Sequence, residues 1–262
     1  MDFAETEDQK MIREMVREFA ETVAGPTCEK RDKEQIAPIE EFKKFAELGF
    51  AGMTIPEQYG GQKLDDISEA IVIEELSRVD PSLGVMVAVH VGLCSMTIAL
   101  SGNEAQKEKY LPKLASGEFL GAYSLSEAGS GTDAAAMVAK ATDDGDYYTL
   151  NGEKMWVTNG TTADLFVLFA KVTDHPDYGK KSHGGVTCFI IEKGFEGFQI
   201  GKKEDKLGLR SSDTCTLILN NCKVPKENVL GEVGKGFPIA MNALDNSRIG
   251  IAAQAVSYTH LR

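Results

Sequence analysis

Two short segments in the middle of the chain carry the residue types that suit a flat, phosphorylated ligand. Residues 123–133 are rich in serine, threonine and glycine, and residues 154–160 contain the only tryptophan of the sequence, Trp156. Glycines let backbone N–H groups approach a ligand closely, hydroxyls donate and accept hydrogen bonds, and an indole offers a large apolar surface. Together these groups suit a planar heterocycle that carries phosphates.

Three other assignments of the glycine-containing segments depend on the structure expected around them. Glycine and serine are common turn formers, so a polar turn beside a core tryptophan also fits. Residues 129–134 read Gly-x-Gly-x-x-Ala, but a dinucleotide fingerprint needs a following helix within a βαβ unit, and antiparallel hairpins are expected here instead. A P-loop is excluded, because Val229 stands where its first glycine would precede Gly234 and Lys235.

Metal-binding and nucleophilic sites find little support in the sequence. No histidine lies at metal-ligand spacing from another histidine, a cysteine or a carboxylate; the four are His90, His175, His183 and His260. We expect His90 to be a hydrogen-bonded core residue and the others to lie in surface loops. No Gly-x-Ser-x-Gly motif marks a nucleophilic serine.

Composition places the chain among soluble globular proteins and limits its partners. The 262 residues carry a formal net charge of −12 without a basic run, so the phosphate backbone of a nucleic acid would be repelled. The five cysteines are scattered, which argues against a disulfide framework and favours a reducing cytosol. The acidic start lacks the features of a secretory or transit signal, so we expect a cytoplasmic protein.

Helical periodicity dominates residues 1–118, which we expect to form an all-helical domain. Thr6 and Gln9 have the spacing of a capping box before the first apolar stripe, and Asn103 and Gln106 repeat it before a later helix. Shorter helices are predicted at residues 39–48 and 67–79, each stopped by a glycine or a proline.

One apolar run must be weighed against insertion into a membrane. Residues 82–103 hold no Asp, Glu, Lys or Arg, and their length is close to the roughly 20 residues that a bilayer requires. Polar residues dilute the run and no basic cluster flanks it. A buried central helix is therefore the favoured interpretation, and no membrane partner is expected.

The sequence changes character after residue 118, and residues 119–229 predict a β-rich domain. An Asn-Gly pair at 151–152 lies between two β-prone runs, which is a strong hairpin signal. Further strand-like runs cover residues 165–172, 186–192 and 215–219. We expect a small antiparallel β-barrel or a sandwich of two sheets, so the fold class is α+β. Residues 230–255 return to helical spacing.

Taken together, the motifs resemble those of the acyl-CoA dehydrogenase family, closest to its short-chain, butyryl-CoA members. In that family the first segment reads Tyr-x-Leu/Val-Thr-Glu-Pro-x-Ala-Gly-Ser-Asp, and the second reads Met-Trp-Ile-Thr-Asn-Gly. The resemblance extends nearly from end to end, through residues 106–117, 206–212, 224–231 and 236–245. It implies that residues 230–255 begin a C-terminal helical bundle whose remainder is missing.

The resemblance implies FAD as cofactor, an acyl-CoA substrate, an electron-transfer flavoprotein as redox partner and a homotetramer in the full-length form. The residues in contact with FAD would be Tyr123, Leu125, Ser126, Gly131, Thr132, Trp156, Val157 and Thr158. Those in contact with acyl-CoA would be Thr132, Asp245, Asn246, Ser247 and Arg248. Two departures from the family's first segment, a serine at Ser126 and an alanine at Ala128, should leave FAD binding largely intact.

The resemblance also implies an incomplete active site. Most family members carry their catalytic Glu in the C-terminal domain, and one branch carries it at the position of Ser247, which cannot act as that base. We therefore expect no catalytic residue in this chain and an inactive fragment. Residues 256–262 break the family's pattern with poor helix formers, and we interpret them as a non-native tail.

The implied reaction is the α,β-dehydrogenation of a short-chain acyl-CoA to the trans-2-enoyl-CoA, with FAD as hydride acceptor. Branched-chain and glutaryl-CoA dehydrogenases share most of these motifs and stay as alternatives. An answer of another class is a non-catalytic fragment that binds flavin or acyl-CoA.

Overall fold

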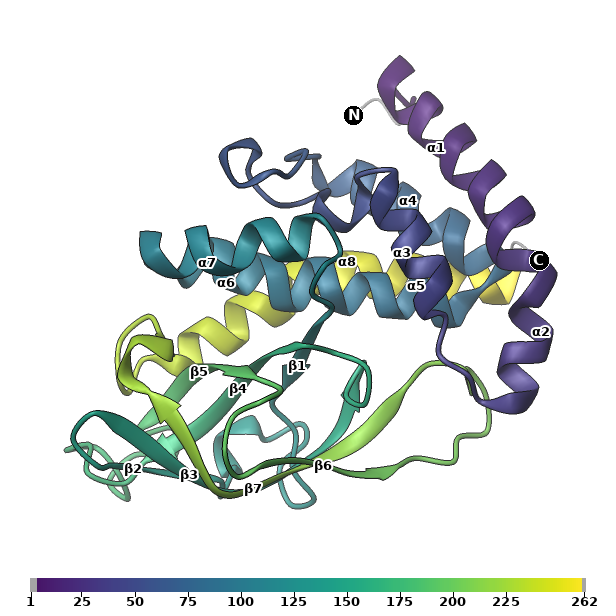
Figure 1. Cartoon of the computed structure of the whole chain (residues 1–262). Helices are drawn as coiled ribbons and strands as arrows, with labels where there is room; N and C mark the ends of the chain where they lie inside the picture. Colours follow the sequence, from purple (N-terminus) through teal and green to yellow (C-terminus); the bar gives the residue numbers. More distant parts are fainter. Residues whose placement is uncertain (1–3, 261–262) are drawn as a thin grey trace.

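The computed structural model describes residues 4–260 and places a layer of helices over a β-sheet (Figure 1). The helices of the first part are α1 (Glu7–Phe19), α2 (Gly25–Glu34), α3 (Ile39–Glu47), α4 (Asp66–Val79), α5 (Pro81–Ala88), α6 (Met96–Ser101) and α7 (Glu104–Ala115). Four short segments join them, the π-helical η1 (Ala20–Ala24) and η4 (Val89–Ser95) and the 3-10 turns η2 (Phe50–Gly52) and η3 (Glu57–Tyr59). The predicted all-helical first part is confirmed.

Both predicted capping boxes are present. The Thr6 hydroxyl accepts from the Gln9 backbone N–H at 3.2 Å, and the Gln9 side chain accepts from the Thr6 N–H at 3.0 Å. Asn103 and Gln106 exchange the same two bonds at the start of α7. Each pair satisfies two backbone donors that the first turn of a helix would otherwise leave without a partner.

The long apolar run forms one helical rod through the middle of the molecule, built from α5, η4 and α6. Asp80 begins it by accepting from the backbone N–H groups of Ser82 and Leu83. Residues 81–101 are long and apolar enough to cross a membrane, but 72% of the most apolar stretch is buried inside the protein. This confirms the prediction of a buried central helix, since neighbouring helices and the sheet cover the rod.

The sheet contains β1 (Gly121–Ser124), β2 (Lys140–Asp143), β3 (Tyr147–Thr158), β4 (Leu165–Val172), β5 (Val186–Glu192), β6 (Phe198–Lys203), β7 (Thr214–Pro225) and β8 (Val229–Leu230). Their order is β6-β7-β3-β2-β4-β5-β8, with β1 beside β4. The α+β class is confirmed. The sheet is not fully antiparallel, because β1 and β2 both run parallel to β4, and it is not a closed barrel, because β6 and β8 at the two ends of the strand order do not pair. The intervening chain serves as the crossover that parallel strands require.

The hairpin predicted at the Asn-Gly pair is wrong. Residues 151 and 152 lie inside the continuous strand β3, and the turn between β2 and β3 comes earlier, at Gly145 with φ of 88°. Gly152, with φ of 144°, interrupts the register with β7, and a Cβ there would lie 2.8 Å from the Cα of Ala139. A glycine is required here because the strand forms a β-bulge and its backbone lies close to that of Ala139.

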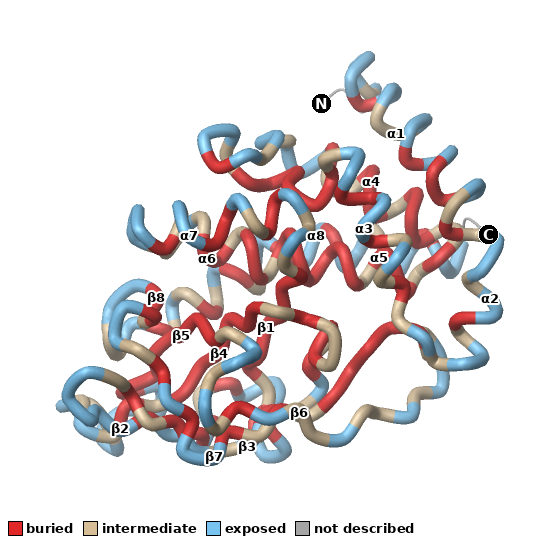
Figure 2. Tube along the Cα trace, in the orientation of Figure 1, coloured by how far each residue is buried: buried red, intermediate tan, exposed pale blue. Residues whose placement is uncertain are grey.

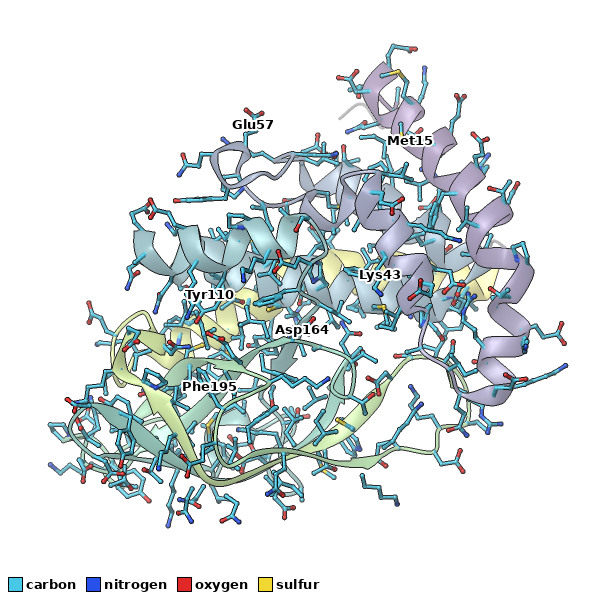
Figure 3. All side chains as sticks on the ribbon, viewed as in Figure 1. Met15, Lys43, Glu57, Tyr110, Asp164 and Phe195 are labelled. Carbon is cyan, nitrogen blue, oxygen red and sulfur yellow. The ribbon has the colours of Figure 1, made fainter. Side chains whose placement is uncertain are left out.

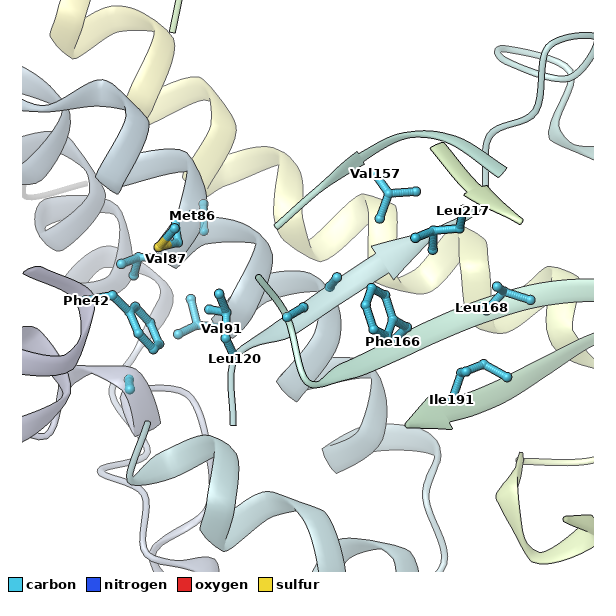
Figure 4. Close-up of a cluster of buried hydrophobic side chains, with 14 of the residues drawn as sticks. Phe42, Met86, Val87, Val91, Leu120, Val157, Phe166, Leu168, Ile191 and Leu217 are labelled. Atoms are coloured by element: carbon cyan, nitrogen blue, oxygen red, sulfur yellow. The ribbon is translucent and has the colours of Figure 1, made fainter. Parts of the chain in front are cut away.

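One apolar core crosses from the helices into the sheet. Figure 4 shows Phe42, Met86 and Val91 of the helical part near Leu120, and the same cluster continues to Phe166. Figure 2 shows buried residues running through α5 and the central strands β4 and β5. Both parts of the chain therefore depend on one another for burial of their apolar surface.

Polar contacts at the same boundary fix the two layers further. Tyr110 and Asp164 lie between the helices and the sheet (Figure 3). The Tyr110 hydroxyl donates to the Glu192 carboxylate at 2.7 Å, and the Asp164 carboxylate accepts from the Leu120 N–H at 3.0 Å.

The last helix, α8 (Gly236–His260), runs back along the helical layer (Figure 1). It packs against α4, α5 and η4, and the Gln254 side chain donates to the Pro81 carbonyl at 3.2 Å. Residues 256–260, expected to be poor helix formers, continue this helix, because Ser257 is buried and donates to the Glu74 carbonyl. Tertiary packing here outweighs weak helix propensity.

Candidate functional site

A cleft of about 550 Å³ opens where the helices meet the sheet. Its walls come from η4, from the turn that follows β1, from the end of β3 and from α8. The lining residues are Val89, Leu93, Tyr123, Leu125, Ser126, Gly131, Thr132, Ala134, Met155, Trp156, Thr158, Met241, Leu244 and Arg248. Its size lies within the range of ordinary small-molecule sites.

A β-bulge near the end of β3 presents Trp156 to the cleft. The register between β3 and β7 shifts between Lys154 and Val157, and Trp156 has φ of 57°. Regular alternation would place Trp156 and Lys154 on the same face, yet Lys154 is fully buried and Trp156 is 62% exposed. The bulge thus turns the indole out of the core, as such irregularities commonly do beside functional sites.

A second wall is a tight turn rich in hydroxyls, residues 125–134. Glu127 and Ser130 exchange two backbone hydrogen bonds at 2.9 and 3.0 Å, and the Ser130 hydroxyl donates to the Asp133 carbonyl at 2.9 Å. A Cβ added at Gly129 or Gly131 would meet nothing within 4 Å, so a ligand can approach this backbone closely.

The two walls are joined beneath the cleft by a buried ion pair. The Lys154 ammonium donates to the Glu127 carboxylate at 2.7 Å and to the Leu125 carbonyl at 3.0 Å. Burial lowers the pKa of Lys154, and the charge of Glu127 opposes that shift. The Met155 N–H adds a further link to the turn by donating to the Ser126 carbonyl at 2.9 Å.

Two ionisable side chains from the described part of the chain line the cleft, and they differ in charge and exposure. The Tyr123 hydroxyl donates to the Ala240 carbonyl at 3.4 Å, and burial raises the pKa of this phenol well above its ordinary value, so it stays neutral. Arg248 is 74% exposed at the rim and lies 3.8 Å from the Asp245 carboxylate. The cleft therefore offers hydroxyls and apolar surface inside and one cation at its mouth, a combination that suits a ligand with an anionic end.

The structure brings most of the predicted site residues together. Eight of them line the one cleft: Tyr123, Leu125, Ser126, Gly131, Thr132, Trp156, Thr158 and Arg248. The side chain of Val157 instead belongs to the apolar core (Figure 4), and Asp245, Asn246 and Ser247 are not part of the lining. Ser247 is buried, and its hydroxyl donates to the Leu244 carbonyl at 3.1 Å.

Much of the cleft lining is apolar and lies outside the residues that the sequence motifs predict. The additional lining residues are Val89, Leu93, Ala134, Met155, Met241 and Leu244. Val89 and Leu93 lie in the apolar run already singled out, and Met241 and Leu244 lie in the apolar stripe of α8. Helical periodicity could mark these residues as buried, but it could not show which of them face a cavity.

His90 is a core residue, as predicted. One ring nitrogen lies 3.1 Å from the Leu114 carbonyl oxygen, and the other accepts from the Gly121 N–H at 3.0 Å. Burial lowers its pKa to about 4. Within residues 4–260, no group of three or more His, Cys, Asp or Glu side chains has the geometry of a metal site.

Comparison with known proteins places the chain in a family. Residues 6–118 match the model of the acyl-CoA dehydrogenase N-terminal domain, and residues 122–222 match that of the acyl-CoA dehydrogenase middle domain. These matches span most of the sequence, and the chain therefore belongs to the acyl-CoA dehydrogenase family.

Two individual relatives show which members of the family this chain resembles. The chain is 47% identical over 256 residues to the short-chain specific acyl-CoA dehydrogenase of Clostridium acetobutylicum, covering 98% of this chain and 66% of that protein. It matches the structure of butyryl-CoA dehydrogenase from Megasphaera elsdenii with a TM-score of 0.93 and 42% identity, covering 98% of this chain and 67% of that one.

A third relative, and the second with a solved structure, is an acyl-CoA dehydrogenase from Bacillus anthracis complexed with FAD. The TM-score is 0.88 and the identity 38%, with 97% of this chain and 43% of that one covered. Our chain thus spans about two thirds or less of the length of these relatives.

Proposed function

We propose that the cleft holds FAD and a short-chain acyl-CoA, and that the chain provides the flavin and substrate walls of an acyl-CoA dehydrogenase. One observation carries this proposal: Thr132 of the hydroxyl-rich turn and Trp156 of the β3 bulge share one cleft. If Thr132 and Trp156 lay on separate faces of the molecule, the two segments could not contact the same ligand. The FAD bound to the Bacillus anthracis relative supports the choice of cofactor.

The residues present fit a flavin. Trp156 offers an exposed indole for a flat ring system, and Thr158 lies beside it at the end of β3. Ser126, Thr132 and the open backbone at Gly131 would serve the polar groups of the cofactor. A bound flavin would supply the acceptor for a hydride from the β-carbon of the thioester.

The apolar wall and the rim would hold the substrate. Leu93 and Leu244 face the cleft from two different helices and would exclude water from an acyl chain. Arg248 at the rim would attract a phosphate of the CoA moiety. Asp245, Asn246 and Ser247 occupy the same stretch of α8, and we keep them as proposed positions near the CoA.

Proton abstraction is the step that the described residues of the cleft lining do not support. No carboxylate is present among the cleft-lining residues in the described part of the chain. Ser247 cannot replace one, because its hydroxyl already donates to the helix backbone and it is not acidic enough to act as a carboxylate base. We infer that these residues bind cofactor and substrate but do not turn the substrate over.

The finer assignments rest on the family. A straight short-chain acyl-CoA agrees with the names of two relatives, and branched-chain or glutaryl-CoA substrates are the alternatives. Electron transfer to an electron-transfer flavoprotein, a homotetramer in the full-length form and a cytoplasmic location are part of the same proposal. So are the domain limits at residues 118 and 229 and the non-native character of residues 256–262.

Titration with FAD tests the cofactor, and butyryl-CoA tests the chemistry. We expect the purified chain to bind FAD and keep its yellow colour after dialysis, and butyryl-CoA added without oxygen to leave that colour unbleached. Loss of all FAD on dialysis would contradict the proposed flavin site. Rapid bleaching would contradict the inference that the cleft residues supply no catalytic base. Fusion of the chain to the C-terminal third of the Clostridium acetobutylicum relative should restore bleaching; a fusion that binds FAD without activity would favour a binding protein.

A further inference from the structure

The ion pair between Lys154 and Glu127 lies immediately behind the cleft but belongs to neither wall's surface. The Lys154 side chain is fully buried and that of Glu127 is 4% exposed. Lys154 directly precedes Met155, and Glu127 directly follows Ser126, and both of these neighbours line the cleft. The pair therefore links the turn to the bulged strand through residues that adjoin the cleft lining.

The carboxylate of Glu127 also reaches a third segment. It accepts hydrogen bonds from the backbone N–H of Val138 at 2.6 Å and of Ala139 at 3.1 Å, just before β2 begins. The same group thus links the turn, the bulged strand and the entry to β2, while the ammonium of Lys154 holds the Leu125 carbonyl.

A pair of apolar side chains would bury this space at a lower cost in desolvation. The ion pair instead fixes how the three segments lie relative to one another. The hydrogen bonds of the carboxylate to two N–H groups and one ammonium group are directional, so they favour a single arrangement. Side chains that touch a ligand need such support from behind if they are to hold their geometry.

We propose that Lys154 and Glu127 are positioning residues of the flavin site, which fix the turn that carries Ser126 relative to the bulge that carries Trp156. The inference rests on the proposed function. Neither side chain touches the ligand; both act through the residues beside them.

The test replaces Glu127 by glutamine, which keeps the size of the side chain and removes its charge. Binding of FAD is followed by the quenching of Trp156, the only tryptophan, so the probe stands in the site itself. We expect Glu127→Gln to weaken FAD binding by about tenfold or more, as loss of a supporting residue commonly does. Lys154→Arg, which keeps the positive charge, should bind FAD more tightly than Lys154→Met.

Asp80 provides a matched control in the helical layer. Its carboxylate is also buried, also accepts from two backbone N–H groups, those of Ser82 and Leu83, and also pairs with a cation, Arg31. Asp80→Asn should lower the melting temperature about as Glu127→Gln does while leaving FAD affinity within about twofold of the unaltered chain. If Asp80→Asn and Glu127→Gln lose FAD affinity equally, the pair of Lys154 and Glu127 only stabilises the fold and does not position the flavin site.

Hydrogen exchange in the ligand-free chain separates this inference from the flavin proposal. Glu127→Gln should speed exchange of the Met155 and Val138 amides, which bond to the turn and to the carboxylate, and Asp80→Asn should not. If the unaltered chain fails to bind FAD, the proposed function falls, and the exchange result still decides whether the pair fixes these walls. Unchanged exchange at both amides, or unchanged FAD affinity in Glu127→Gln, would overturn the inference.

Discussion

At the scale of single residues, the types of the cleft side chains could be predicted from the sequence, but their directions could not. The chemistry of Ser126, Thr132 and Trp156 predicts a shared ligand site, and all three line one cleft. The family resemblance places Val157 beside them at the flavin, yet the bulge turns its side chain into the core. The shift of register depends on pairing with β7, a strand about 60 residues away, and no local pattern records it.

Arg248 gives a prediction at this scale. Arg248 is the one cation on the cleft lining within residues 4–260, so it should attract the anionic end of the substrate. Its 74% exposure means that salt screens the attraction. We expect Arg248→Ala to raise the Kd for butyryl-CoA about tenfold at low salt, with FAD affinity unchanged and the difference shrinking as ionic strength rises.

Isothermal titration of the FAD-loaded chain at two salt concentrations measures this effect. Lys202→Ala, which removes an exposed cation from β6 outside the cleft lining, is the control and should leave the Kd for butyryl-CoA unchanged. A salt-independent loss in Arg248→Ala would point to lost packing instead of lost charge.

At the scale of elements, local signals were reliable where a short segment satisfies its own backbone. The capping boxes at Thr6 and Asn103 belong to this class, and both were predicted correctly. The Asn-Gly pair at 151–152 gave a wrong hairpin prediction. A glycine that favours a tight turn also fits a β-bulge where another strand approaches closely. The parallel pairing of β1 and β2 with β4 was equally invisible, since register between distant strands is set by the shared core.

The packing of α4 against η4 and α8 yields a prediction for pH. The Glu69 carboxylate on α4 lies where Cβ atoms on Gly92 and Gly250 would come within 3.2 and 3.4 Å of it. Burial, with a smaller contribution from Asp66, raises its pKa to about 7 from 4.5. The folded state therefore holds a proton that the unfolded state releases, and stability is lost as pH rises from 4.5 to 7.

Glu69→Gln should remove this loss. We expect the variant to match the unaltered chain near pH 4.5 and to exceed its free energy of unfolding by about 3 kcal/mol at pH 8, as measured by urea unfolding. An equal gain at both pH values would mean that packing, and not ionisation, is responsible.

At the scale of the whole molecule, the family's two domains share a core. Among the described residues, two apolar clusters span the helical part and the sheet, and Leu120 lies in one of them at the junction before β1. The cleft lies at the same junction, so its two walls are held together by the packing that holds the domains together. The apolar contacts across the boundary lead us to expect that the helical part and the sheet unfold as one cooperative unit.

Leu120→Ala tests this coupling. Leu120 is 4% exposed, and truncation of a buried leucine costs about 2–5 kcal/mol, so the melting temperature should fall by several degrees. If the core is shared, far-ultraviolet circular dichroism, dominated by the helices, and Trp156 fluorescence, which reports on the sheet, should still lose signal in a single common transition. Leu100→Ala, at a position 55% exposed on α6, should change the melting temperature little. Two separate transitions in the unaltered chain would show instead that the helices and the sheet fold independently, and that the cleft can open between them without unfolding either part.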